Sequence, residues 1–254
     1  MSIKKILTAI ICNLSLVVAV QAEPTMTVSI AKTDSAAAVS DETKANTIEA
    51  INTVVDFFNE YFYLEESIEL LVGAEDGPLY NGDGQIQLPY SFVEEIEQRF
   101  TQAEYQKTGV SVAQAVADSL KHTLIHEFAH AVIHSANIPV LGREEDAADS
   151  LASVLLIEYF EDGSEIVISA ADLFELEGED SDVVTAEDFW GEHSLNPQRY
   201  YAAMCHVYGS DPQEYADIPE RLEFSEDRAE LCIQEYEDLS YSWQKLLQPI
   251  LKAQ

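Results

Sequence analysis

The sequence predicts one domain of the α+β class that is mainly helical and carries a small β-sheet. Apolar residues recur every three or four positions over several long stretches, which is the period of an amphipathic helix. Between the first two stretches lie a short β-prone run and a segment with Asn-Gly and Asp-Gly turn pairs. A chain of 254 residues is long enough to bury one sizeable core.

The first 22 residues have the features of a secretory signal peptide. Lys4 and Lys5 precede an apolar run over 6–20, and the triplet at 20–22 fits a cleavage site. The run is short for a membrane span, and no later stretch is long and uncharged enough to be one. We therefore expect export, to the periplasm or by full secretion, without a stable membrane anchor. Small polar residues over 23–44 predict a flexible lead-in to a domain at 45–254.

The first half of this domain is expected to alternate helix and strand. A one-sided apolar face predicts a helix at 45–62, and the apolar run at 67–72 predicts a strand. Two short β-prone pieces at 79–80 and 85–88, joined by the turn pairs, predict a hairpin. The helix expected next, at 90–106, has an apolar face of Phe92, Val93, Ile96 and Phe100.

The second half is expected to be almost entirely helical. The capping box Ser111-x-x-Gln114 starts a long helix that ends near His134. A short connection then leads into a helix at 143–160, so these two helices should form an antiparallel hairpin. The remaining expectations are a strand at 163–169, an acidic segment at 172–182, a helix with Asn196 as cap and Pro197 at its first position, and a last helix at 225–251.

The chain is strongly acidic. It has 13 Lys and Arg against 47 Asp and Glu, a formal net charge of −34, and loss of Lys4 and Lys5 would take this to −36. Such a surface repels nucleic acid and anionic membranes. It either keeps the protein soluble or attracts cationic substrates, and composition alone favours solubility.

Two cysteines, Cys205 and Cys232, follow the predicted signal peptide. Neither belongs to a C-x-x-C zinc motif, and a cysteine pair in an exported protein is more often a disulfide than two free thiols. We therefore predict a disulfide between them.

The strongest motif is H-E-x-x-H at 126–130, inside the long predicted helix. His126 and His130 are four residues apart, so both can bind one metal ion from the same helix face. Glu127 stands at the edge of that face, where its carboxylate can act as a general base on a metal-bound water. A surface helix that happens to carry these residues is the alternative, but apolar neighbours indicate a buried site in which three polar groups need a reason.

Zinc in a hydrolase takes three protein ligands, so a third is expected on the next helix. Glu145 and Asp149 share a face there, and we assign Glu145 as the ligand and Asp149 as the acceptor for a ligand histidine. Glu144 is the rival for the ligand position. Otherwise Glu144 and Asp146 belong to a charged first turn that favours a helix N-terminus.

These motifs carry a family resemblance. HEFAH followed by E-x-x-x-D resembles the gluzincin metallopeptidases, the thermolysin- and neprilysin-like group, and the stretch from HEFAHAVIH to LGREEDAADSLA is similar to a bacterial family of putative metallopeptidases of unknown function. The resemblance implies a zincin-like catalytic domain at 45–254, with the HExxH helix packed on the ExxxD helix. It also implies zinc-dependent hydrolysis of peptides or proteins, and an extended substrate paired with the sheet edge at Leu79 and Tyr80.

A second segment, W-G-E-H-S-L-N-P-Q-R at 190–199, is similar to a neprilysin-type motif. The resemblance implies that His193 stabilises the transition-state oxyanion and that Arg199 holds substrate backbone. Gly191 stands where that family has Asp, so Glu192 or Asp188 would have to orient His193. The alternative is a helix-capping loop with an incidental histidine.

Three other histidines are given no role in the chemistry. His122 and His134 are expected to be flanking polar residues, and His206 to be structural. Two rival functions stay open at this stage. One is a zinc-bound module that does not cleave, against which the intact Glu127 argues; the other is an acidic helical interaction protein without metal.

Overall fold

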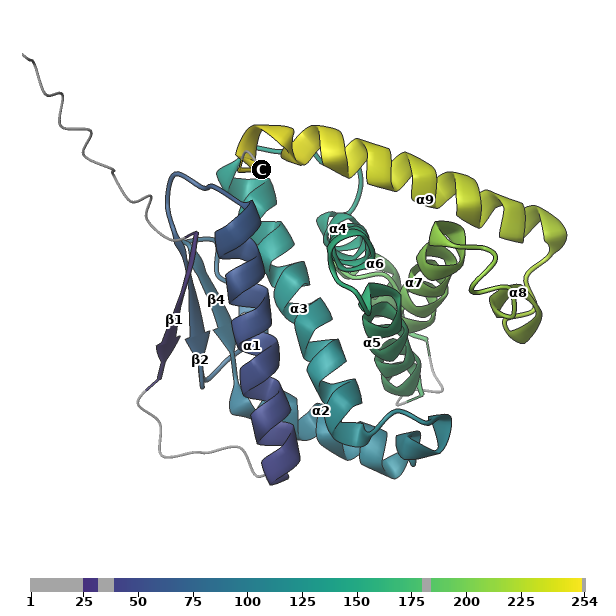
Figure 1. The fold of residues 1–254 in the computed structure, drawn as a ribbon, viewed down its shortest axis with the longest axis horizontal. Coiled ribbons are helices and arrows are strands. Elements are labelled where there is room, and N and C mark those ends of the chain that lie inside the picture. The colour runs from purple at the N-terminus through teal and green to yellow at the C-terminus, as the bar shows by residue number, and fades with distance from the viewer. Residues whose placement is uncertain (1–24, 32–38, 180–183, 253–254) are drawn as a thin grey trace, which may run out of the picture.

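The computed structural model describes residues 25–31, 39–179 and 184–252, without the side chains of residues 187 and 188 (Figure 1). It is mainly helical with a small mixed sheet, as predicted. The predicted signal peptide lies outside the described residues. No helix in the described ranges combines the length and apolar character needed to cross a membrane.

The sheet has the strand order β1-β2-β4-β3 and lies against α1 and α3 (Figure 1). β2 (Ile68–Val72) pairs in parallel with β1 (Met26–Ile30) and with β4 (Gln85–Leu88). β3 (Leu79–Tyr80) pairs antiparallel with β4, so the predicted hairpin is confirmed. Residues 26–30 were expected to be a flexible lead-in; they instead form a strand, because β2 offers them a full parallel register.

Two long helices form the centre of the molecule. α1 (Asp41–Tyr61) begins four residues earlier than expected, because the Ser40 side chain accepts a hydrogen bond from the Thr43 N–H and caps the helix. α3 (Val112–Ser135) begins after Ser111, whose side chain accepts from the Gln114 N–H. α2 (Tyr90–Gln102) and a 3₁₀ turn (Tyr105–Thr108) replace the single helix predicted at 90–106.

The other helices gather on the far side of α3 from the sheet (Figure 1). α4 (Glu144–Tyr159) packs on α3 as the predicted hairpin requires. α5 (Gly163–Gly178) contacts α3, α4 and α7 (Asn196–Ser210). α9 (Glu226–Leu247) crosses α4 and α7, and α8 (Ile218–Arg221) is a short turn of helix before it.

Two predictions in this half were wrong. The segment 163–169 is the start of α5 rather than a strand, and the acidic stretch to 178 continues the same helix. Buried residues recur at helical spacing from Ile166 through Ala170 to Phe174, so a long helix buries more than a short strand could. The cap of α7 is Leu195 rather than Asn196, which makes Asn196 the first helical residue.

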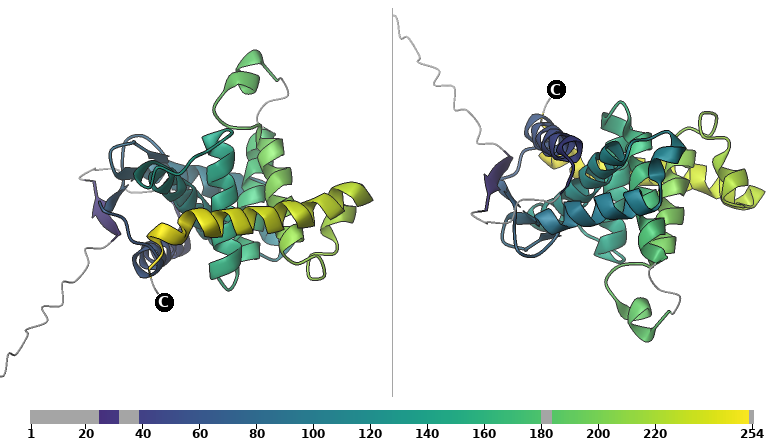
Figure 2. Two further views of the ribbon diagram at one scale, coloured as in Figure 1. Left: turned by 90° about the horizontal axis from the view of Figure 1, so that it is seen from above. Right: turned by 90° about the horizontal axis from the view of Figure 1, so that it is seen from below.

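The predicted disulfide between Cys205 and Cys232 is confirmed, and it joins α7 to α9. The short helix α6 (Ala186–Trp190) stands apart from the other helices in both views of Figure 2. Its Phe189 and Trp190 are exposed. The loop that follows α6 leads back to α7 and carries His193.

Candidate metal centre

The H-E-x-x-H motif lies in the buried middle of α3. This helix has apolar side chains on all sides, which is typical of a helix enclosed by other elements. His126 is only 5% exposed and Glu127 only 7%. The helix contacts α1 on one side and α4 on another, so its polar face opens only where β3 and the start of α4 leave room. The motif therefore lies in a buried helix, and not in a surface helix that carries these residues by chance.

Three ligand atoms converge at this opening. The His126 Nε2 and His130 Nε2 atoms are 3.2 Å apart, and the Glu145 Oε2 atom lies 3.2 Å from the first and 3.3 Å from the second. Two metal bonds of about 2.0–2.1 Å that meet at a tetrahedral angle separate their ligand atoms by about 3.3 Å. The three atoms therefore have the spacing of one face of a tetrahedral site, and the donor set of two imidazoles and a carboxylate can hold a metal ion.

Each ligand histidine has a carboxylate at its other ring nitrogen. Asp149 Oδ1 lies 2.7 Å from His126 Nδ1, as predicted. Glu144 Oε1 lies 2.8 Å from His130 Nδ1. From the sequence, Glu144 was either the rival ligand or part of the charged first turn; in the structure it meets the outer nitrogen of His130, and Glu145 joins the ligand group. Such contacts fix which nitrogen of the ring faces the metal and raise its basicity.

Charge in the cluster is balanced by Arg199. Its Nε and Nη2 atoms donate to both Asp149 oxygens, at 2.7 and 2.8 Å. Its guanidinium lies 3.9 Å from the ring centre of Phe174. Burial alone would raise the pKa of Asp149, but the hydrogen bonds from Arg199 and His126 outweigh it and hold that pKa well below its ordinary value. Asp149 is therefore a carboxylate at all pH values of interest.

The same carboxylates act on the ligand histidines. Burial disfavours the charged form of His126, but Asp149 and Glu145 overcome it and raise its pKa to about 9 in the metal-free protein. The pKa of Glu145 is lowered: burial opposes this, and contacts with His126, His130 and His193 outweigh burial.

Glu127 and the three residues of the ligand cluster line one open cleft. The cleft has a volume of about 730 Å³, and β3, Glu144, Glu192 and His193 also border it. Burial raises the pKa of the Glu127 carboxyl, although the Tyr80 backbone N–H donates to it and nearby His126 and His130 lower that pKa. A carboxyl at an open cleft beside the ligand residues can accept a proton from a bound molecule.

His193 reaches the cluster from the loop after α6. Its Nε2 atom lies 2.9 Å from Glu145 Oε2, and its side chain is 53% exposed. Arg143, at the cap of α4, holds this loop: it donates to the backbone oxygens of His193 and Phe189 at 2.8 and 3.2 Å. Glu192 lines the cleft, while the Asp188 side chain lies outside the described residues. Arg143 had no predicted role, and a contact across fifty residues leaves no local sequence signal.

The remaining predicted residues lie at different places relative to the cleft. Arg199 does not line the cleft; it lies behind Asp149, so its predicted hold on substrate backbone stays a prediction. His134 lies at the cleft, 3.3 Å from the Tyr80 hydroxyl. Neither His134 nor His122 nor His206 belongs to the ligand group found among the described residues.

Comparison with known proteins agrees with this geometry. A family model described as putative metallopeptidase matches residues 31–247, which include every residue of the cluster. No curated protein and no solved structure matches the chain at a significant level.

Proposed function

The chain belongs to this family of putative metallopeptidases, and on that premise we propose that it is a zinc-dependent peptidase of the gluzincin type with a zincin-like fold. The single observation that carries the proposal is the convergence of His126, His130 and Glu145 beside Glu127 at an open cleft. We also propose that residues 1–22 direct the protein to the periplasm or to full secretion.

Zinc is the metal that best suits this donor set. Two imidazoles and one carboxylate form the ligand set of many zinc peptidases, and an open fourth position leaves room for water. When bound, zinc acts as a Lewis acid that makes water more acidic and polarises a carbonyl. His126, His130 and Glu145 would hold it, with Asp149 and Glu144 orienting the two imidazoles.

Glu127 is the proposed general base and acid. Its carboxylate takes a proton from the attacking water and then delivers that proton to the nitrogen of the leaving amine. Its burial at the cleft, beside the three ligand residues, supports this role.

His193 is the proposed donor to the oxyanion. It is an exposed histidine that lines the cleft, and its position beside Glu145 supports this role. A donor that meets charge only in the transition state stabilises that state more than the bound substrate. For Arg199, the contacts with Asp149 support a positioning role behind the metal site, in addition to the hold on substrate that the resemblance implies.

The cleft also suggests how substrate lies and which substrates are preferred. β3 is at one edge of the described sheet and borders the cleft, so an extended peptide can add to it as a further strand. Glu144 and Glu192 also line the cleft, and the described lining contains no lysine or arginine. We therefore propose that peptides with a basic residue near the cleaved bond are preferred.

Metal removal and return tests the proposal. The purified protein is stripped with a chelator, dialysed, and incubated with a mixture of unmodified peptides before and after one equivalent of zinc. We expect cleavage only after zinc is restored, with Lys and Arg enriched near the new termini. Cleavage by the stripped protein at the restored rate would contradict a metal-dependent reaction.

A further inference from the structure

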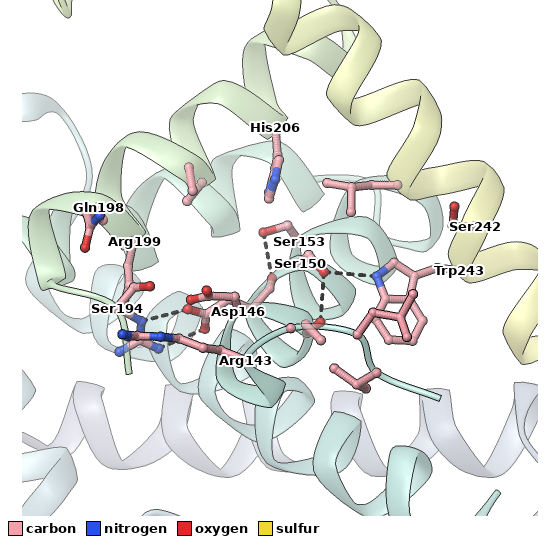
Figure 3. A pocket seen from close by; sticks show the side chains of 18 of the residues that line it. Arg143, Asp146, Ser150, Ser153, Ser194, Gln198, Arg199, His206, Ser242 and Trp243 are labelled. Atoms are coloured by element: carbon pink, nitrogen blue, oxygen red, sulfur yellow. Dashed lines mark hydrogen bonds and ion pairs between the residues drawn. The ribbon is translucent and has the colours of Figure 1, made fainter. Parts of the chain in front are cut away.

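A second cavity borders α4 (Figure 3). It has a volume of about 700 Å³ and is enclosed by α4, α7, α9 and the connection at 139–143. Among the described residues, none that lines it also lines the metal cleft. The two spaces therefore have separate linings, although Asp149 and Arg199, which support the metal site, border this one.

Two buried histidines line this cavity. Figure 3 shows the ring of His206 directed into it, toward Ser153. The Nδ1 atom of His206 and the Nε2 atom of His122 have no hydrogen-bond partner among the described residues, and both residues line the cavity. His206 is 9% exposed and His122 only 2%. Buried nitrogens without a partner destabilise a fold, so native proteins retain them mainly where something else completes the bond.

The wall of the cavity carries no excess charge. Arg143 and Arg199 face it, but so do Asp146 and Asp149, and the two positive charges are matched by two negative ones. The guanidinium of Arg199 is bound to Asp149, and that of Arg143 to backbone oxygens. Burial lowers the pKa of His122 to about 3 and that of His206 to about 4, so both rings are neutral at pH 7. An ion would therefore gain little here.

The rest of the lining is a mixture of hydroxyl groups and apolar surface. Ser150 and Ser153 lie on the α4 side, and Ser150 Oγ accepts a hydrogen bond from Trp243 Nε1 at 3.0 Å. Apolar wall is supplied by Val140, Phe174, Leu239 and Leu246. A neutral imidazole can donate at one nitrogen and accept at the other, so such a wall suits a ligand that offers both kinds of group.

We propose that this cavity is a second ligand site, which takes an uncharged molecule with an amide or hydroxyl group on a small apolar body. Its volume is in the usual range for small-molecule sites, and its few polar groups converge on the space from an otherwise apolar wall. The same chemistry is found in a free small molecule and in a distant residue of a long peptide substrate. Both sources would offer the same groups to the two histidine rings.

A direct test measures the binding of N-acetyl-L-leucinamide to the full-length, metal-loaded protein. Binding is detected by calorimetry and by changes in the ¹⁵N signals of the histidine rings. We expect saturable binding that shifts the signals of His122 and His206 and leaves those of His134 unchanged. His206→Phe keeps the ring shape and removes its nitrogens, and should weaken binding at least tenfold. Ser242→Trp, at an exposed position of α9 on the cavity wall, should block binding without disturbing the core.

Thr47→Val is the matched control. Thr47 Oγ1 is the other buried side-chain atom without a partner among the described residues, but it lies on α1, outside this cavity, so binding should be unchanged. Absence of saturable binding, or equal binding by wild type, His206→Phe and Ser242→Trp, would show that the cavity holds only water and would overturn the proposal.

Addition of a peptide hydroxamate that occupies the metal cleft distinguishes the two sources. Simultaneous binding of a short hydroxamate and the probe, with displacement of the probe only by longer peptides, would identify the occupant as part of a long substrate. Simultaneous binding at every peptide length would identify a separate small molecule. The assay measures binding rather than cleavage, so its failure is distinct from a failure of the peptidase proposal.

Discussion

Glu144 Oε1 lies 2.8 Å from Nδ1 of His130, and it stands next to Glu145, whose carboxylate meets both ligand imidazoles. These neighbouring residues at the start of α4 thus have different roles. Glu144 contacts the outer nitrogen of a ligand ring, whereas Glu145 points to the metal position. Asp149, one turn later, does for His126 what Glu144 does for His130. The first turn and a half of α4 supplies one ligand and both orienting groups.

The ligand and its neighbour can be separated by substitution. Glu145→Ala should remove most of the bound zinc, because the site keeps only two protein ligands. Glu144→Ala should retain it with reduced affinity. Metal content after dialysis at a fixed free zinc concentration measures both. Full retention in Glu145→Ala with loss in Glu144→Ala would exchange the two assignments.

Loss of an orienting carboxylate should weaken metal binding in proportion to its burial. Asp149→Ala should cost on the order of ten- to a hundredfold in zinc affinity. Glu144→Gln should cost less, because its side chain is 50% exposed while that of Asp149 is 18% exposed. Competition with a zinc-binding dye gives the affinities. Asp146→Asn, in the same turn, is the control, and an equal loss there would point to helix stability instead.

Substitution of His193 tests the oxyanion role. His193→Ala or His193→Phe should lower kcat on the order of a hundredfold with little change in KM, and zinc should stay bound. Arg143→Met should also lower kcat, but by less, because it releases the backbone of His193 and leaves the imidazole ring present. Steady-state kinetics on one cleaved peptide measures both. Wild-type kcat in His193→Ala would end the assignment and leave Glu127 and the metal ligands untouched.

Arg199→Met distinguishes two roles for the buried guanidinium. If Arg199 chiefly positions Asp149, zinc affinity should fall together with kcat, because Asp149 loses both of its hydrogen bonds from Arg199. If it chiefly holds substrate, KM should rise while zinc affinity stays the same. The geometry leads us to expect the first result. Paired measurements of zinc affinity and KM on one preparation decide between them.

The disulfide should matter for stability rather than for chemistry. Replacement of both Cys205 and Cys232 by Ser releases a loop of 27 residues between α7 and α9. Loops of this length contribute roughly 3 kcal/mol when they are closed. We expect a lower Tm in thermal unfolding and an unchanged zinc affinity. Two free thiols in protein taken directly from the exported fraction would remove the basis of this prediction.

The stability of the fold should depend on pH through Asp172. Burial raises its pKa, although Tyr105 donates to it at 2.6 Å. A raised pKa means that the folded state binds the proton more tightly, so this group's stabilisation is present at low pH. It is lost as pH rises through the folded-state pKa. Asp172→Asn should therefore raise Tm at pH 7 and have little effect near pH 4. Asp56→Asn, at an exposed position of α1, is the control, and an equal change there would contradict the account.

Local spacing allowed much of this site to be predicted from the sequence. His126 and His130 share a helix face wherever a helix forms, and Glu145 and Asp149 do the same on the next one, so a short connection is enough to bring the pairs together. Glu144 could have been assigned only from the angle between α3 and α4. Arg143 donates to the backbone oxygen of His193, and a contact with backbone cannot be predicted from the pattern of side chains in the sequence.

The errors in the fold have a similar origin. Ile166 and Val167 are β-branched, and such residues favour strands in isolation, but here both are buried in α5, which packs on α3 and α4. The segment 26–30 has only moderate strand character. It becomes a strand because β2, forty residues later, pairs with all of it. In both places tertiary contacts decide what local preference leaves open.

The most direct measurement compares wild type with Glu127→Gln in one experiment that records zinc content and cleavage of a peptide library. We expect about one zinc per chain in both proteins. We also expect cleavage by wild type and loss of cleavage on the order of a thousandfold or more in Glu127→Gln, since the amide can neither take nor return a proton. Cleavage at the wild-type rate by Glu127→Gln, or zinc in both proteins without cleavage by either, would contradict the claim that this is a zinc peptidase.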